Sequence, residues 1–142
     1  MTTMRHILDR KGRAIHCVSP EDPVLEAIRL MAEHHVGALL VMRGEELAGI
    51  VSERDYARKV ILLGRSSSDT PVWQIMSSPV TTVGPGAGLE ECMRIMTERR
   101  IRHLPVLEGQ RVIGVISIGD LVKSFIEEQR ETIEQLESYI RR

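Results

Sequence analysis

The chain has 142 residues, a length typical of one compact domain and short for an enzyme with separate cofactor and substrate lobes. Its 19 Lys and Arg side chains are balanced by 20 Asp and Glu, so no excess of basic charge favours binding to DNA or RNA. Apolar runs such as VGALLVM are too short to cross a membrane, and the N-terminal segment lacks the apolar core of a signal peptide. These features predict a soluble, cytoplasmic protein with no membrane partner.

The sequence repeats itself at a spacing of 65 residues. Residues 18–55 align without a gap to residues 83–120, and such internal repetition indicates two copies of one structural unit. A lead-in also recurs, because MRHIL before the first copy resembles VWQIM before the second. We therefore predict one repeat with its lead-in at 1–65, a second repeat at 66–126 and a C-terminal helical extension at 127–142.

In chain order, each copy predicts an extended segment, a helix, two β-strands joined by a turn, and a closing helix. Apolar residues recur at helical spacing from Val24 to Val36 and again from Leu89 to Ile101. The extended segments and strands are predicted at 14–18, 37–42 and 47–51 in the first copy and at 79–83, 103–107 and 112–116 in the second. One copy is too small to be stable alone. The prediction is an α+β fold in which two β-α-β-β-α repeats pack about a pseudo-twofold axis.

A short motif recurs where the last strand of each copy meets the closing helix. It reads GIVSERD from Gly49 and GVISIGD from Gly114. A Ser followed three residues later by an acid is close to the capping-box spacing, but a cap alone does not explain the fixed distance to a glycine. A helix N-terminus with a Ser hydroxyl suits a phosphate, a short carboxylate suits a vicinal diol, and glycine admits close backbone approach. Phosphate and diol together describe a ribonucleotide.

The doubled motif, with HVGALLV and RIRHLPV before it, resembles a tandem pair of cystathionine-β-synthase (CBS) domains, also called a Bateman module. The resemblance covers the chain from Ile15 to Ile126, and the SERDYARKV and SIGDLVKS segments resemble those of small stand-alone CBS-pair proteins. Membership would imply binding of adenosine ligands, namely AMP, ADP, ATP, NAD(H) or S-adenosylmethionine, in two clefts between the halves.

The same resemblance implies a set of binding residues. In the family the motif Asp binds ribose hydroxyls, the Ser lies by the phosphate and apolar residues enclose the adenine. One cleft would be formed by Val115, Ser117 and Asp120 with Ile15, Val36, Gly37 and Ala38. The other would be formed by Ile50, Ser52, Arg54 and Asp55 with Val80, Ile101, Arg102 and His103.

Arg54 distinguishes the two copies, because Gly119 takes its place in the second. A cation at a helix N-terminus is disfavoured unless an anion bridges it, so we expect a phosphate partner for Arg54. The alternative is a surface ion pair with a neighbouring glutamate, Glu45, Glu46 or Glu53.

These features predict a non-catalytic regulatory module that senses adenine nucleotide and signals to a partner protein. Two alternatives stay open: a redox enzyme using Cys17 or Cys92, and a purely structural dimerisation unit. The cysteines form no C-x-x-C motif and are expected to be buried. His34 and His35 complete no ligand set, so no metal is predicted.

The C-terminal segment carries a short heptad pattern. Its members follow one another at alternating steps of three and four residues: Ile126, Gln129, Ile133, Leu136 and Ile140. Such a seam favours self-association into a homodimer. The alternative is a helix that folds back onto its own domain.

Overall fold

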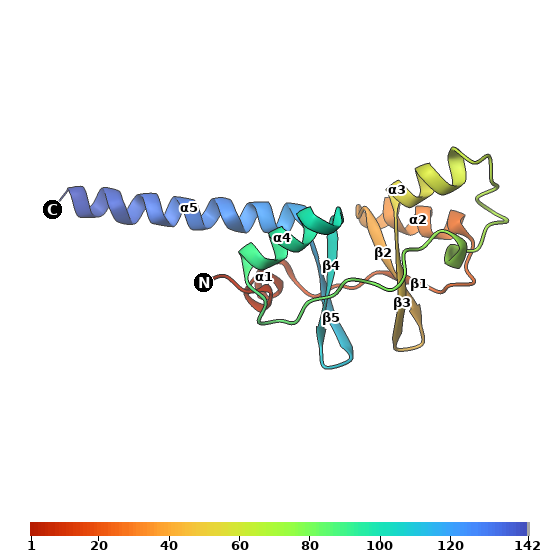
Figure 1. Cartoon of the computed structure of the whole chain (residues 1–142), viewed down its shortest axis with the longest axis horizontal. Helices are drawn as coiled ribbons and strands as arrows, with labels where there is room; N and C mark the ends of the chain where they lie inside the picture. The colour runs from red at the N-terminus through yellow and green to blue at the C-terminus, as the bar shows by residue number, and fades with distance from the viewer. Residues whose placement is uncertain (142) are drawn as a thin grey trace. The chain divides into compact units, whose positions relative to one another are not determined.

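The computed structural model describes residues 1–141 and has the predicted alternation of helices and strands (Figure 1). The elements are α1 (Met4–Lys11), β1 (Cys17–Val18), α2 (Val24–His34), β2 (Ala38–Arg43), β3 (Glu46–Ser52), α3 (Glu53–Tyr56), α4 (Leu89–Arg99), β4 (His103–Glu108), β5 (Arg111–Ser117) and α5 (Ile118–Ile140). A π-helical turn, Ala57–Ile61, continues α3, and a 3-10 turn lies at Val72–Gln74. The α+β class is confirmed. Within residues 1–141, no helix has both the length and the apolar character needed to cross a bilayer.

The chain divides into two compact units, and their boundaries differ from those of the two sequence repeats. One unit, the first-copy unit, is Ala14–Thr81, and the other, the second-copy unit, is Met1–Arg13 together with the chain from Thr82 onward. The first lead-in therefore belongs to the second-copy unit, and the second lead-in belongs to the first-copy unit. The division at 65 and 66 that follows from the sequence repeat differs from this grouping. Of the predicted extension 127–142, residue 142 lies outside the described residues.

The first-copy unit is built on a three-stranded sheet. β1 pairs in parallel with β2, and β2 pairs antiparallel with β3, so that Ala38 lies opposite Ser52. The core on this sheet joins α2, the strands and the second lead-in. Its buried members are Val18, Val24, Ala27, Met31, Leu39, Val41, Val51, Val60, Val72 and Ile75.

The second-copy unit is built on the β4–β5 hairpin, in which His103 lies opposite Ser117. The predicted extended segment at 79–83 contributes only one isolated parallel bridge, between Val83 and Val106. Both hairpins have a register shift at the same point, after Val41 and after Val106. The core includes three buried residues of α1, which are Met4, Ile7 and Leu8.

The motif glycines lie under lead-in side chains. A Cβ built on Gly114 would lie 2.5 Å from Cδ2 of Leu8, and one built on Gly49 would lie 2.6 Å from Sδ of Met76. Leu8 is fully buried, so the missing Cβ is what lets α1 pack onto β5. The sequence-based interpretation, in which these glycines admit a ligand to the backbone, is therefore wrong for this face of the strand.

We expect Gly114→Ala to destabilise the protein by about 1–3 kcal/mol, because an added methyl in a filled core forces its neighbours to move. Chemical denaturation would measure the change. Gly86→Ala is the matched control, since a Cβ there meets no atom within 4 Å. Adding Leu8→Ala to Gly114→Ala should recover part of the loss caused by the glycine change. Strict additivity of the two changes would contradict the packing argument.

Candidate functional site

The two motif serines and aspartates form complete capping boxes. Ser52 N donates to Asp55 Oδ2 at 2.9 Å, and Asp55 N donates to Ser52 Oγ at 3.2 Å. The second copy repeats the pair, since Ser117 N donates to Asp120 Oδ2 at 2.8 Å and Asp120 N donates to Ser117 Oγ at 3.2 Å. The predicted cap is confirmed in both copies, with Asp serving where Glu is commoner.

The first turn of each helix has few amides left for an anion. Glu53 N donates to Gly37 O at 3.0 Å, and Ile118 N donates to Arg102 O at 2.9 Å. With the two capping-box bonds, three of the four terminal amides are used within the protein. Among the described residues, the amides of Arg54 and Gly119 are the ones without such a partner. An anion at either helix would therefore meet one amide of the turn.

The two motif carboxylates differ in their cationic partners. Asp120 Oδ2 accepts from Lys11 Nζ at 2.6 Å, and the same ammonium donates to Val115 O at 2.9 Å. Asp55 instead has Lys59 one turn along its own helix, with Nζ 3.3 Å from Oδ1. Lys11 comes from α1 and lies outside the aligned copies, so the repeat gave no signal for it. It is the residue near the motif that sequence reasoning missed.

The pKa of Asp120 is lowered from its ordinary value. Burial is the largest single influence and acts in the opposite direction, but the hydrogen bonds from Lys11 and Ser117, together with the charge of Lys11, outweigh it. The carboxyl is thus ionised at neutral pH and held by an ammonium. This charge state suits hydrogen bonds from hydroxyl donors.

His103 lies beside this carboxylate. It faces Ser117 across the β4–β5 pair, in the place that Ala38 takes opposite Ser52. Burial lowers its pKa, Lys11 and Arg102 lower it further, and Asp120 partly offsets these effects. The imidazole is therefore mainly neutral at pH 7, with one nitrogen able to donate and one able to accept.

The remaining predicted residues differ in exposure and in whether they lie at a cap. Arg54, Arg102 and Ile15 are exposed, and the half-buried ones are Val36, Gly37, Ala38, Ile50, Val80, Ile101 and Val115. The structure brings Gly37 and Ala38 to the Ser52 cap, and Arg102 and His103 to the Ser117 cap. Each predicted cleft combines residues of both units, and that combination stays a proposal.

Comparison with known proteins decides the family. The CBS domain profile matches residues 4–62 and again residues 72–127. The chain belongs to the CBS-domain family. The recognition of a tandem pair from the doubled motif is confirmed.

Relatives of this CBS pair cover most of its length. The mitochondrial CBS domain-containing protein CBSX3 of Arabidopsis thaliana is 41% identical over 98% of this chain and 72% of its own. The solved structure of a candidate signal-transduction protein with CBS domains from Burkholderia ambifaria is 56% identical, with a TM-score of 0.87 over 90% of this chain and 96% of its own.

Two more distant structures bear on ligands and assembly. The CBS domain pair of protein MJ0100, in complex with 5′-methylthioadenosine and S-adenosyl-L-methionine, has a TM-score of 0.80 at 20% identity over 90% of this chain and 98% of its own. That likeness shows the fold alone. A hexameric CBS-CP12 protein from bloom-forming cyanobacteria has a TM-score of 0.78 at 27% identity over 98% of this chain and 86% of its own.

The cysteines of the CBS pair have different environments. Cys92 is buried, and burial, helped by the charge of Glu91, raises its pKa to about 11. Cys17 is exposed, so the expectation that both are buried is wrong for this residue, which lies in a two-residue edge strand. In the described part of the chain, no three His, Cys, Asp or Glu side chains gather as metal ligands. His34 stacks on His16, with ring centroids 3.8 Å apart.

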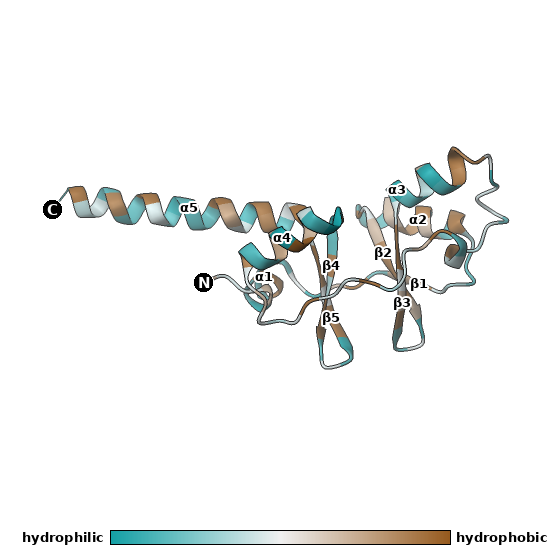
Figure 2. Cartoon of the chain, viewed as in Figure 1, coloured by the Kyte–Doolittle hydropathy of each residue, from teal (hydrophilic) through white to brown (hydrophobic). Residues whose placement is uncertain are grey.

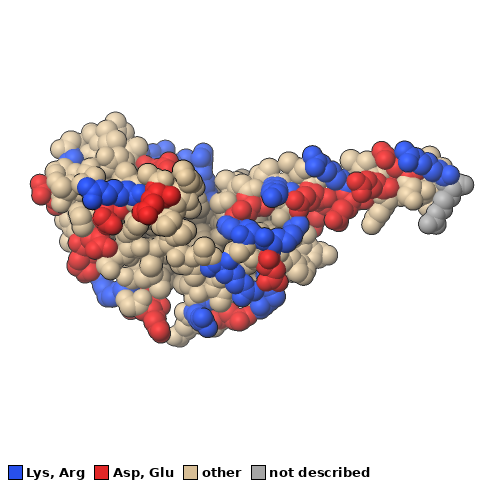
Figure 3. Space-filling model, turned by 180° about the vertical axis from the view of Figure 1, so that it is seen from behind, with Lys and Arg blue, Asp and Glu red and all other residues tan. Residues whose placement is uncertain are grey.

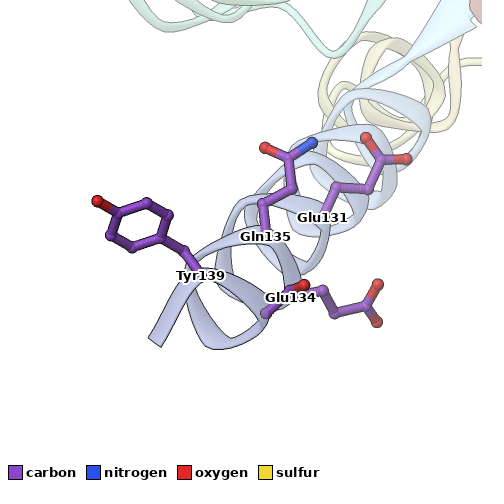
Figure 4. A pocket seen from close by; sticks show the side chains of 5 residues that line it. Glu131, Glu134, Gln135 and Tyr139 are labelled. Carbon is purple, nitrogen blue, oxygen red and sulfur yellow. The ribbon is translucent and has the colours of Figure 1, made fainter. Parts of the chain in front are cut away.

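Two surface features lie away from the predicted residues. Figure 3 shows acidic and basic side chains interspersed on the face it displays, in keeping with the balanced composition. Figure 4 shows a shallow hollow along α5, lined by Glu131, Glu134, Gln135, Ser138 and Tyr139. All five belong to one helix and are exposed, so we assign no ligand to it.

We expect Lys11→Met to lower stability at neutral pH and to raise the pKa of Asp120. An Asp whose folded pKa is depressed stabilises the fold above its unfolded pKa, and this stabilisation is lost as pH falls through the folded pKa. The difference between parent and variant should therefore be present at about pH 7 and shrink at about pH 3. Urea denaturation at both pH values, with NMR titration of the Asp120 carboxyl, checks this.

Arg94→Met is the control for Lys11→Met, because Arg94 is exposed on α4. An equal loss of stability at both pH values in Lys11→Met would assign the effect to packing of the lysine stem rather than to its charge.

Proposed function

We propose that this CBS pair is a non-catalytic regulatory module that binds adenine nucleotides, namely AMP, ADP, ATP or NAD(H), and signals their presence to a partner protein. The observation that carries the proposal is the pair of capped Ser-x-x-Asp junctions, one in each unit. The adenosine ligands of MJ0100, a protein with the same fold, support the ligand class. Ligand would act by binding one conformation more tightly than another.

The free oxygen of each motif carboxylate suits a ribose. Each cap is made through Oδ2 alone. Among the described residues no hydrogen bond is made by Asp120 Oδ1, and Asp55 Oδ1 meets only Lys59 at 3.3 Å. A ribose hydroxyl could donate to Oδ1 while the cap stays formed. Binding would then leave the helix start intact.

Arg54 is our choice for the phosphate contact. Its side chain is exposed at the second position of α3, next to the amide without a partner. In the described residues it forms no ion pair with Glu45, Glu46 or Glu53, which weakens the surface-pair alternative. A phosphate could accept from both the guanidinium and the amide.

The two alternatives fit the observations less well. A redox enzyme using Cys92 needs a thiolate, and the raised pKa of Cys92 disfavours one. Cys17 is exposed and free, but the other cysteine is buried, so no exposed cysteine pair is formed. A purely structural unit does not require Arg54 to stand unpaired beside a free amide.

We further propose that the CBS pair forms a homodimer. The hexameric CBS-CP12 protein is a precedent for self-assembly. We also propose a cytoplasmic location, although a curated relative is named as mitochondrial.

We expect at least one ligand among AMP, ADP, ATP and NAD(H) to raise the melting temperature of the parent protein. Ligand at a hundred times its Kd adds about 2.7 kcal/mol of stability. The ligand-induced shift should vanish in Asp55→Ala/Asp120→Ala. Thr3→Ala is the control, because Thr3 caps α1 by the same kind of capping box. This variant loses a helix cap without losing a motif carboxylate. Flat melting curves for nucleotide-free parent protein with every ligand would favour the structural alternative.

We expect Arg54→Ala to weaken the binding of ADP, ATP and NAD(H) by about 1.5–3 kcal/mol, the range for a hydrogen bond to a charged group. The binding of adenosine, which has no phosphate, should be unchanged. Calorimetric titration measures both. Arg58→Ala is the matched control, because Arg58 is an exposed arginine one turn further on. If Arg54→Ala binds every ligand as the parent does, Arg54 is a surface charge.

A further inference from the structure

The heptad seam of α5 is exposed along its whole length. We define the seam as Val122, Ile126, Gln129, Ile133, Leu136 and Ile140. All six are exposed, and the apolar ones keep between 43% and 80% of their surface accessible. Figure 2 shows hydrophobic bands that recur along α5 between hydrophilic ones. An exposed apolar stripe of this length is unusual for a helix that acts alone.

The opposite face of α5 is the one that packs on its own unit. Leu121 and Ser124 are buried there. On the same side, Glu127 pairs with Arg10 at 2.5 Å, and Glu128 accepts from the backbone of Thr2. The helix therefore does not fold back on its seam. Beyond Glu128 every described residue of α5 is exposed, and the helix extends past α1 and α4 (Figure 1).

We propose that the seam binds the α5 seam of a second copy of this chain, in antiparallel orientation, with Ile126 packed against Leu136 of the partner subunit. The proposal deepens the homodimer proposed above and is independent of nucleotide binding. In this register Val122 meets Ile140 of the partner subunit, and Gln129 meets Ile133 of the partner subunit. All apolar seam residues are covered, and each Gln129 lies beside an apolar residue with its polar end near solvent.

The flanking positions favour this orientation. Lys123 would lie beside Glu137 of the partner subunit, and Phe125 beside Tyr139 of the partner subunit, each contact occurring twice by symmetry. Both aromatic residues are exposed now, and edge-to-face pairs of this kind are favourable. Two Arg130 side chains would meet at the symmetry axis, but they are exposed and solvated.

A parallel pairing uses the same residues less well. It would set Phe125 beside Arg130 of the partner subunit and Thr132 beside Glu137 of the partner subunit, leaving Lys123 without an acidic partner. It would also place the helix macrodipoles side by side in the same direction, whereas the antiparallel pair opposes them. The antiparallel pair is therefore the one that matches charge with charge.

Disulfide trapping tests the orientation. In a Cys17→Ser background, Ile126→Cys and Leu136→Cys are prepared separately, one with a size tag, mixed and oxidised mildly. Cys92 can stay because it is buried with a raised pKa. We expect the mixed Ile126→Cys/Leu136→Cys dimer to be the main product, and no such product when Ser138→Cys, on the outer face, replaces Leu136→Cys. Self-linked Ile126→Cys as the main product would overturn the antiparallel proposal.

Charge exchange tests the flank. Lys123→Glu should raise the dimer Kd about tenfold, as expected for losing two exposed ion pairs and gaining repulsion. Adding Glu137→Lys to Lys123→Glu should restore the Kd of the parent. Glu134→Lys, on the outer face of the same helix, should not compensate. Analytical ultracentrifugation of the full chain measures each Kd.

Leu136→Asp separates the failure of this proposal from failure of the others. We expect it to give a monomer that keeps the nucleotide-dependent thermal shift of the parent. A dimer that persists in Leu136→Asp would overturn the seam as the interface while leaving self-association through another surface. A parent protein that is monomeric at all concentrations would overturn both the seam interface and the homodimer. Neither a persistent dimer nor a monomeric parent bears on nucleotide binding.

Discussion

The close approach of a lead-in side chain to a glycine is the contact on which both caps depend. Leu8 covers Gly114, and Met76 covers Gly49, in each case three residues before the motif serine. A filled contact at that point fixes how the strand enters the helix. The capping box that follows is therefore held from behind by the core as well as by its own hydrogen bonds.

The same contact explains why the two copies treat their aspartates differently. Lys11 follows Leu8 by three residues on α1, so packing of Leu8 brings the ammonium to Asp120. The residue three positions after Met76 is Pro79, which offers no such group, and Asp55 has Lys59 instead. A difference between two nearly identical motifs thus arises from segments that lie outside the aligned copies.

Much of the fold could be predicted because its signals are local. The helical periodicity and the Ser-x-x-Asp caps depend on residues within about seven positions of one another. Each hairpin joins two strands through a short turn, and the repeat shows when the sequence is aligned with itself. The seam of α5 could be read in the same way. The role of the motif glycines could not, because it requires knowing that residue 8 lies on residue 114. Lys11 and the exposure of Cys17 were missed for the same reason, since neither follows from periodicity.

The candidate site was predictable in its chemistry more than in its details. The acid and hydroxyl at each helix start are where the motif indicated, and His103 faces Ser117 as Ala38 faces Ser52. The motif predicts a helix end with several free amides. Hydrogen bonds to the carbonyls of Gly37 and Arg102 leave fewer amides free at these helix ends. This happens because β2 and β4 begin directly beside the cap serines.

The exchange of lead-ins has a consequence for the order in which the chain folds on the ribosome. The first-copy unit is continuous in sequence and can close as soon as residue 81 has emerged. Helix α1 is made before the first-copy unit, yet its glycine partner is residue 114, which at roughly 5–20 residues per second follows about 5–20 s later. Until then the apolar face of α1 has no core to join. Helix α1 thus precedes the other described helices in the sequence, yet it is among the last of them to be buried.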